Sequence, residues 1–233
     1  MVTRGDVYRL DYGHFVRPAA ETGTGRPRVE PVLGYLVRHP DGLLLFDTGL
    51  SDADSEAAKH YRIAPRRLDD ALRAAGAGRD DVRLVVNCHL HLDHCGGNAL
   101  LAGRPIVVQA AELDAAGRPG YTLPELVDFP GAVYRTIDGE AELLDGVWVV
   151  PTPGHTDGHQ SLVVRCADGT VILAGQSHDS ASGYAADQLA WRVAARDGGP
   201  PAAPYPGWVD RLQRFDPARV LFAHDLAVWE PGG

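Results

Sequence analysis

The sequence predicts an α/β fold in which helices pack outside two β-sheets. Groups of short apolar strands occur in both halves of the chain, and helices with an apolar face accompany each group. Three of the strands lead into loops that carry histidine. Because a sheet has to bury its apolar face against another layer, this repeated pattern favours a layered sandwich. The chain has no low-complexity segment and no clear linker, so we expect one domain over residues 1–233.

The expected strands are short apolar runs bounded by turn residues. They span residues 32–39, 42–49, 81–87, 105–109, two runs within 141–155, two within 161–176, and 218–224. The expected helices have apolar residues at helical spacing. They span residues 64–76, 110–117, 184–195 and 204–215. Gly76 ends the first of these helices, as is typical of a helix C-cap. Loops within three segments are expected to set specificity, residues 12–31, 118–132 and 177–206.

Composition narrows the class of partner. The formal net charge of −9 argues against a nucleic acid or an anionic membrane as the main partner, since either requires a basic face. No apolar run approaches the ~18 residues of a membrane span. The first residues lack the apolar core of a signal peptide, and three cysteines do not suggest a disulfide framework. We therefore expect a cytoplasmic protein with reduced thiols.

Metal-binding residue types concentrate in residues 85–98, which read VVNCHLHLDHCGGN. On a strand, His89 and His91 would point to the same side, because side chains alternate with a period of two. Asp93 and His94 follow where the backbone turns, so they can face a second metal ion. Nitrogen and carboxylate ligands of this kind suit zinc, and also iron or manganese.

One metal ion needs three or four ligands, so this segment requires partners elsewhere in the chain. Two histidines meet the requirement, and both follow predicted strands. His155 lies in the Gly- and Pro-rich segment PTPGHTDGH (151–159), and His224 lies in LFAHD (221–225). Loops at strand ends are where functional residues concentrate.

The combination of HLHLDH, PGHTDGH and a late strand-end histidine resembles the metallo-β-lactamase superfamily, and most of all its N-acyl homoserine lactonase branch. The resemblance runs from about residue 32 to residue 225. It implies an αββα four-layer sandwich with one or two Zn²⁺ ions at one edge of the sheets, where Fe²⁺ or Mn²⁺ would also suit. It implies that Asp47 braces the metal loop. It also implies the metal ligands, His89, His91 and His155 for the first ion and Asp93, His94 and His224 for the second.

One position departs from the family pattern. The family usually has a bridging aspartate after the strand that matches TVILAG, and this chain has Gln176. Three outcomes follow for the metal site. Gln176 or a bridging hydroxide replaces the carboxylate, His178 or Asp179 supplies a substitute ligand, or one metal binds firmly and the other weakly.

Four further residues lie near the predicted ligands in the sequence. His178 and Asp179 are candidate acid/base groups, alongside Asp93, with a polar loop and helix cap as the alternative for the first two. His159 is expected to be a hydrogen-bonded loop residue rather than a ligand. Cys88 is expected to point into a sheet and to take no part in the site.

The sequence therefore predicts a metal-dependent hydrolase in which a metal-bound hydroxide opens a lactone or ester carbonyl of a small-molecule substrate. A thioester hydrolase of the glyoxalase II type is the alternative within the same chemistry. A weakly hydrolytic or iron-dependent redox protein is the alternative that Gln176 leaves open. We expect a monomer or a homodimer.

Overall fold

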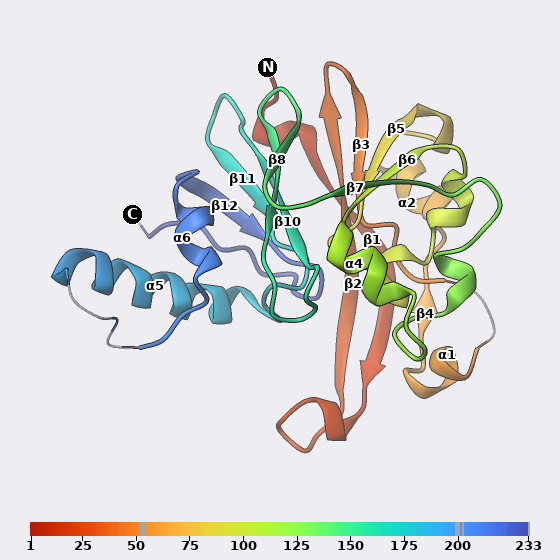
Figure 1. The fold of residues 1–233 in the computed structure, drawn as a ribbon, viewed down its shortest axis with the longest axis horizontal. Coiled ribbons are helices and arrows are strands. Elements are labelled where there is room, and N and C mark those ends of the chain that lie inside the picture. Colours follow the sequence, from red (N-terminus) through yellow and green to blue (C-terminus); the bar gives the residue numbers. More distant parts are fainter. Residues whose placement is uncertain (52–54, 199–200, 202, 233) are drawn as a thin grey trace.

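Two β-sheets face each other, and helices cover their outer faces, which confirms the predicted four-layer α/β sandwich (Figure 1). The computed structural model describes residues 1–51, 55–198, 201 and 203–232. Within these residues, no helix is both long enough and apolar enough to cross a bilayer.

The first sheet has seven strands in the order β4-β1-β2-β3-β5-β6-β7. They are β1 (Val7–Arg17), β2 (Arg28–His39), β3 (Gly42–Phe46), β4 (Ala64–Pro65), β5 (Val82–Val86), β6 (Pro105–Gln109) and β7 (Val133–Ile137). Strands β3, β5, β6 and β7 run parallel. The second sheet has five strands in the order β12-β11-β10-β9-β8. They are β8 (Ala141–Leu144), β9 (Val147–Pro151), β10 (Gln160–Val164), β11 (Thr170–Leu173) and β12 (Pro217–Leu221).

Helices flank each sheet on its outer side. They are α1 (Glu56–His60), α2 (Leu68–Ala74), α3 (Leu92–Cys95) and α4 (Ala110–Ala116) beside the first sheet, and α5 (Ala181–Asp197) and α6 (Trp208–Gln213) beside the second. Short 3-10 turns occupy Arg4–Asp6, Ala19–Glu21, Arg79–Asp81, Asn98–Leu101 and Pro124–Leu126. The predicted helix over 64–76 starts later than expected, because Ala64 and Pro65 pair with β1 as an edge strand.

The expectation of a loop over residues 12–31 is wrong at both ends. Strand β1 continues to Arg17 and β2 begins at Arg28, so the two form a long hairpin that projects from the sheets (Figure 1). The register of this pair shifts between Asp11 and His14, where Gly13 has a φ of 98°. This irregularity breaks the alternation of apolar and polar residues that marks a strand in sequence. Strand β7 was also not expected, and all of its side chains are partly or fully exposed.

Alternate residues of the first sheet pack on opposite sides, as the period of a strand requires. Leu36 of β2 and Leu45 of β3 pack against the outer helices, whereas Val37 and Leu44 pack between the sheets. The central strands are thus buried on both faces, which leaves their ends as the place for polar chemistry. The carboxyl ends of parallel strands meet at one edge, where ligands bind in open α/β sheets.

Candidate metal centre

Six side chains from three strand-end loops converge at this edge. The loop after β5 contributes four of them, and the loops after β9 and β12 contribute one each; the loop after β11 brings Gln176 beside them. The six are His89, His91, Asp93, His94, His155 and His224. They form two groups of three, each with its ligand atoms within 4.8 Å of one another.

The first group consists of three imidazole nitrogens. Nε2 of His89 lies 3.0 Å from Nδ1 of His91, which lies 3.1 Å from Nε2 of His155. Tetrahedral ligands at zinc–nitrogen distances lie about 3.3 Å apart, so this triangle fits one ion. The predicted reason for the convergence of His89 and His91 is wrong, because β5 ends at Val86 and both follow it in a loop.

The second group contains one carboxylate and two imidazoles. Oδ2 of Asp93 lies 3.4 Å from Nε2 of His94 and 3.3 Å from Nε2 of His224. The two histidine nitrogens are 3.3 Å apart. This near-equilateral triangle has the ligand separation that a tetrahedral zinc ion requires, and its mixed set also suits iron or manganese.

Asp47 braces the loop, as the resemblance implied. Its carboxylate accepts hydrogen bonds from the backbone N–H of Cys88 at 2.8 Å and from Nδ1 of His94 at 3.0 Å. The second bond fixes the tautomer of His94 and leaves Nε2 free as a ligand atom. His224 is fixed in the same way, because its Nδ1 lies 2.9 Å from the carbonyl oxygen of Pro31.

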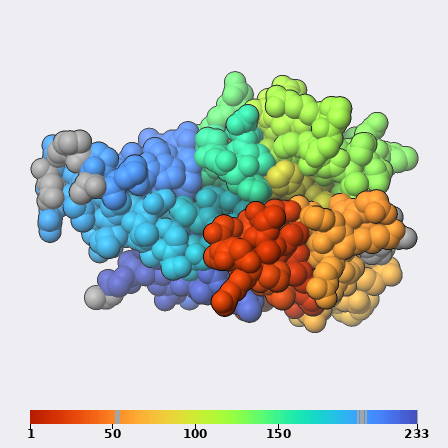
Figure 2. All heavy atoms as spheres, turned by 90° about the horizontal axis from the view of Figure 1, so that it is seen from below, coloured from red at the N-terminus to blue at the C-terminus, as the bar shows by residue number. Residues whose placement is uncertain are grey.

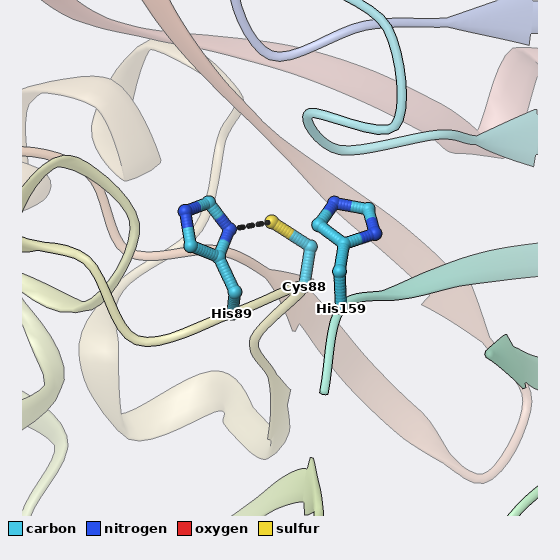
Figure 3. A group of neighbouring side chains, drawn as sticks. All are labelled: Cys88, His89 and His159. Atoms are coloured by element: carbon cyan, nitrogen blue, oxygen red, sulfur yellow. Dashed lines mark hydrogen bonds between the residues drawn. The ribbon is translucent and has the colours of Figure 1, made fainter. Parts of the chain in front are cut away.

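Cys88 is part of this arrangement, so the expectation that it takes no part in the site is wrong. Its fully buried thiol donates to Oδ2 of Asp47 at 3.0 Å and lies 3.1 Å from Nδ1 of His89 (Figure 3). Sulfur therefore accepts the N–H of His89 and donates its own proton to Asp47. Burial and the charge of Asp47 raise the pKa of Cys88, so it remains a neutral thiol.

His159 lies on the other side of Cys88 and is a hydrogen-bonded structural residue, as predicted (Figure 3). Its Nε2 accepts the backbone N–H of Gln176 at 3.0 Å, so its Nδ1 carries the proton and donates to Thr152 Oγ1 at 2.8 Å. This pair of bonds holds the loop that carries Gln176 against the loop that carries His155.

Glu112 was not anticipated, and it ties three loops of the site together. Its fully buried carboxylate accepts hydrogen bonds from the backbone N–H of Leu90 and the hydroxyl of Thr156, each at 2.7 Å, and from Tyr121. A Cβ on Gly158 would lie 2.2 Å from the backbone nitrogen of Glu112, so glycine is required for this close approach. An acidic residue in the first turn of a helix is so common that the sequence carried no signal for it.

Burial sets the charge state of the first group. It lowers the pKa of His155 to about 3, with a further contribution from His91, and it lowers the pKa of His89 well below its usual value. Neutral imidazoles are the form that binds a metal ion. At the second group burial acts against charge, but the carboxylates of Asp93 and Asp47 raise the pKa of His94. The carboxylates of Asp93 and Asp47 therefore favour a positive charge at the second group, supplied by a proton on His94 or, in its place, by a bound metal ion.

Gln176 is 5% exposed and lines a cavity of about 460 Å³ together with His91, Asp93 and His155. The predicted position of this residue at the centre is thus consistent with the fold. Apolar and aromatic side chains form most of the remaining wall, namely Phe15, Leu50, Ala57, Tyr61, Ile63, Leu92, Tyr121 and Leu123.

His178 and Asp179 lie outside both the cavity lining and the two groups of ligand atoms. Nε2 of His178 lies 3.1 Å from Oδ2 of Asp187, and its ring packs against Trp208. Asp179 pairs with Arg28 at 3.1 Å. Burial opposes its ionisation, but the hydrogen bond from Arg28 lowers the pKa of Asp179.

A family model described as the metallo-β-lactamase superfamily matches residues 27–224, a span that contains both groups. The chain belongs to the metallo-β-lactamase superfamily. Members of this superfamily bind divalent metal ions, typically zinc.

The predicted likeness to the N-acyl homoserine lactonase branch is confirmed. An N-acyl homoserine lactonase from Bacillus sp is 33% identical over 156 residues, covering 61% of this chain and 62% of that protein. One from Rhizobium johnstonii is 30% identical over 174 residues, covering 65% and 66%. A solved quorum-quenching N-acyl homoserine lactone hydrolase is 26% identical, with a TM-score of 0.73 over 97% of this chain and 93% of that one. The sequence alignment thus spans less than two thirds of the curated relatives.

Proposed function

We propose that this protein is a metal-dependent hydrolase that opens lactone rings, within a wider capacity for ester and thioester bonds. The observation that carries the proposal is the pair of ligand triangles on the wall of one largely apolar cavity. The names of the similar lactonases support the choice of bond. A small-molecule substrate fits a cavity of about 460 Å³.

The ligands that would hold two zinc ions are the six converging side chains, His89, His91 and His155 for one ion and Asp93, His94 and His224 for the other. When bound, such ions lower the pKa of water and polarise a carbonyl group. Gln176 would contribute its amide oxygen from the cavity wall. The pair of ions would then have a single carboxylate ligand, Asp93.

Other residues of the chain orient and shield the reaction. Asp47, Cys88 and Glu112 fix the ligand loops, so the site is organised before substrate arrives. The apolar wall excludes water and receives the hydrocarbon part of the substrate. Asp93 lines the cavity, so the geometry favours it over His178 and Asp179 for moving the proton to the leaving oxygen. The cytoplasmic location and the monomer or homodimer state stay predictions.

The test combines metal analysis with a panel of lactones, thioesters and β-lactams. We expect two equivalents of zinc and loss of lactone opening on chelation. His91→Ala should lower metal content and abolish activity, whereas His60→Ala should change neither, because His60 lies on α1 and is 58% exposed. Activity that survives His91→Ala would overturn the assigned site. Turnover of thioesters alone would select the glyoxalase-type alternative, and iron with oxygen consumption would select redox chemistry.

A further inference from the structure

Apart from histidines, Arg17 of β1 is the only basic residue among the described residues that line the cavity. Figure 2 shows the face of the molecule on which the β1–β2 hairpin, in red, lies beside the α1 segment, in orange. Arg17 shares the cavity with the metal-group residues His91 and Asp93, and its charge is felt by both. A guanidinium beside a metal centre in an apolar wall is a binding group for an anion.

A buried carboxylate holds this guanidinium in place. Nε and Nη2 of Arg17 donate to the two oxygens of Glu30 at 2.7 and 2.8 Å, and Glu30 is 2% exposed. Within the described residues, Nη1 of Arg17 has no hydrogen-bond partner. The bidentate pair therefore fixes the side chain while leaving one nitrogen free to donate.

The same network contains a second arginine, Arg28, that can be compared with Arg17. Arg28 also donates to Glu30, at 2.7 Å, but it pairs with Asp179 and does not line the cavity. The network is neutral overall, with two guanidiniums and two carboxylates. Neither Glu30 nor Asp179 lines the cavity, so Arg17 is the one member of this network in the cavity wall.

We propose that Arg17 is a specificity-determining residue that binds a carboxylate on the substrate, at a distance from the lactone or ester group that is opened. The substrate class is thus an anionic lactone or ester, in which a short hydrocarbon chain links the reacting carbonyl to a carboxylate. The reaction in this inference rests on the proposed function. The selectivity for a carboxylate rests on Arg17, Glu30 and the cavity. In the part of the chain that the structure describes, Asp93 is the only acidic side chain of the lining, and Gln176 is neutral, so little opposes an anion there.

The experiment uses the zinc-loaded protein and a pair of five-membered lactones. Each lactone carries the same short chain, which ends in a carboxylate in one and in a carboxamide in the other. We expect the wild type to prefer the carboxylate by at least about tenfold in kcat/KM, chiefly through KM. Arg17→Met should remove the preference, Arg17→Lys should retain part of it, and Arg28→Met, the matched control, should keep it.

A second measurement separates selectivity from reaction. Glutarate binding, measured by calorimetry on the same zinc-loaded proteins, should weaken about tenfold in Arg17→Met and remain unchanged in Arg28→Met. If neither lactone is opened, the proposed function fails, and the glutarate result alone decides the role of Arg17. The inference is overturned if the wild type shows no preference, or if Arg17→Met, folded as judged by its unfolding midpoint, keeps both the preference and the glutarate affinity. Should Arg17→Met not fold, Arg17→Lys and Arg28→Met decide by the same comparison.

Discussion

Replacing Cys88 with alanine should weaken metal binding at the first group, although the thiol is not itself one of the three ligands. The sulfur accepts the N–H of His89 and donates to Asp47, and both bonds are buried. Alanine removes the sulfur from both bonds and adds no atoms near Gly175, where a Cβ would lie 2.6 Å from the Cβ of Cys88. The packing between the sheets therefore loses one atom without a new clash.

The expected magnitude follows from the hydrogen bonds lost. Without the sulfur, Nδ1–H of His89 is left buried and unpaired, a loss of about 1–3 kcal/mol. Loss of a residue that orients a metal ligand typically lowers metal affinity by about 10- to 100-fold, which corresponds to about 1.4–2.7 kcal/mol. The two estimates agree, so we expect a zinc dissociation constant 10- to 100-fold higher, as a rough range.

Competition with a chromophoric chelator measures the dissociation constants of both ions. Cys88→Ser is the matched control, because a hydroxyl can both accept from His89 and donate to Asp47; its zinc affinity should remain within about threefold of the wild type. A folded Cys88→Ala protein with wild-type affinity would refute the role of the thiol. Equal losses in the alanine and serine variants would assign the effect to packing instead.

Three further predictions concern residues around the two ligand groups and the cavity. Glu112→Gln should lower the free energy of unfolding by about 1–3 kcal/mol, because an amide cannot accept from all three donors that face it; an unchanged denaturation midpoint would contradict this. Gln176→Asp should raise the zinc retained after dialysis, and equal stoichiometry in both proteins would show that the glutamine costs no metal affinity. Burial opposes ionisation of Glu30, but Arg17 and Arg28 lower its pKa below the usual 4.5. Its stabilising contribution is therefore present above that value and lost as pH falls through the lowered pKa, so the destabilisation caused by Glu30→Gln should shrink below about pH 4. A difference in unfolding free energy that stays constant from about pH 6 to pH 3 would contradict the last prediction.

The converging side chains were predictable because their residue types signal metal binding wherever they gather. His89, His91, Asp93 and His94 stand within six positions, and a metal needs more ligands than one such turn supplies. The missing ligands had to come from elsewhere in the chain, and histidines at other strand ends could supply them. These residues converge whatever the local structure, since His89 meets His91 from a loop rather than from the expected strand.

The roles of Cys88, Glu112 and Arg17 were not predictable, because they depend on contacts across the fold. Cys88 meets Asp47, which is 41 positions away in the chain, only after β3 and β5 have paired. Arg17 falls in an expected loop because the irregular register near Gly13 hides the strand that carries it. Propensity and periodicity describe neighbours within one element, and none of these contacts lies within one element.

Asp47 connects the two ligand groups into one structure. Its carboxylate orients His94 directly and His89 through the thiol of Cys88, so one side chain constrains a histidine of each group. Asp47 adopts a φ of 62°, a left-handed conformation that is uncommon for residues other than glycine. Strain of this kind persists only where surrounding contacts hold it, and here three hydrogen bonds to the carboxylate do so. The strained backbone at the end of β3 thus places the buried carboxylate of Asp47 where it can fix a histidine in both groups.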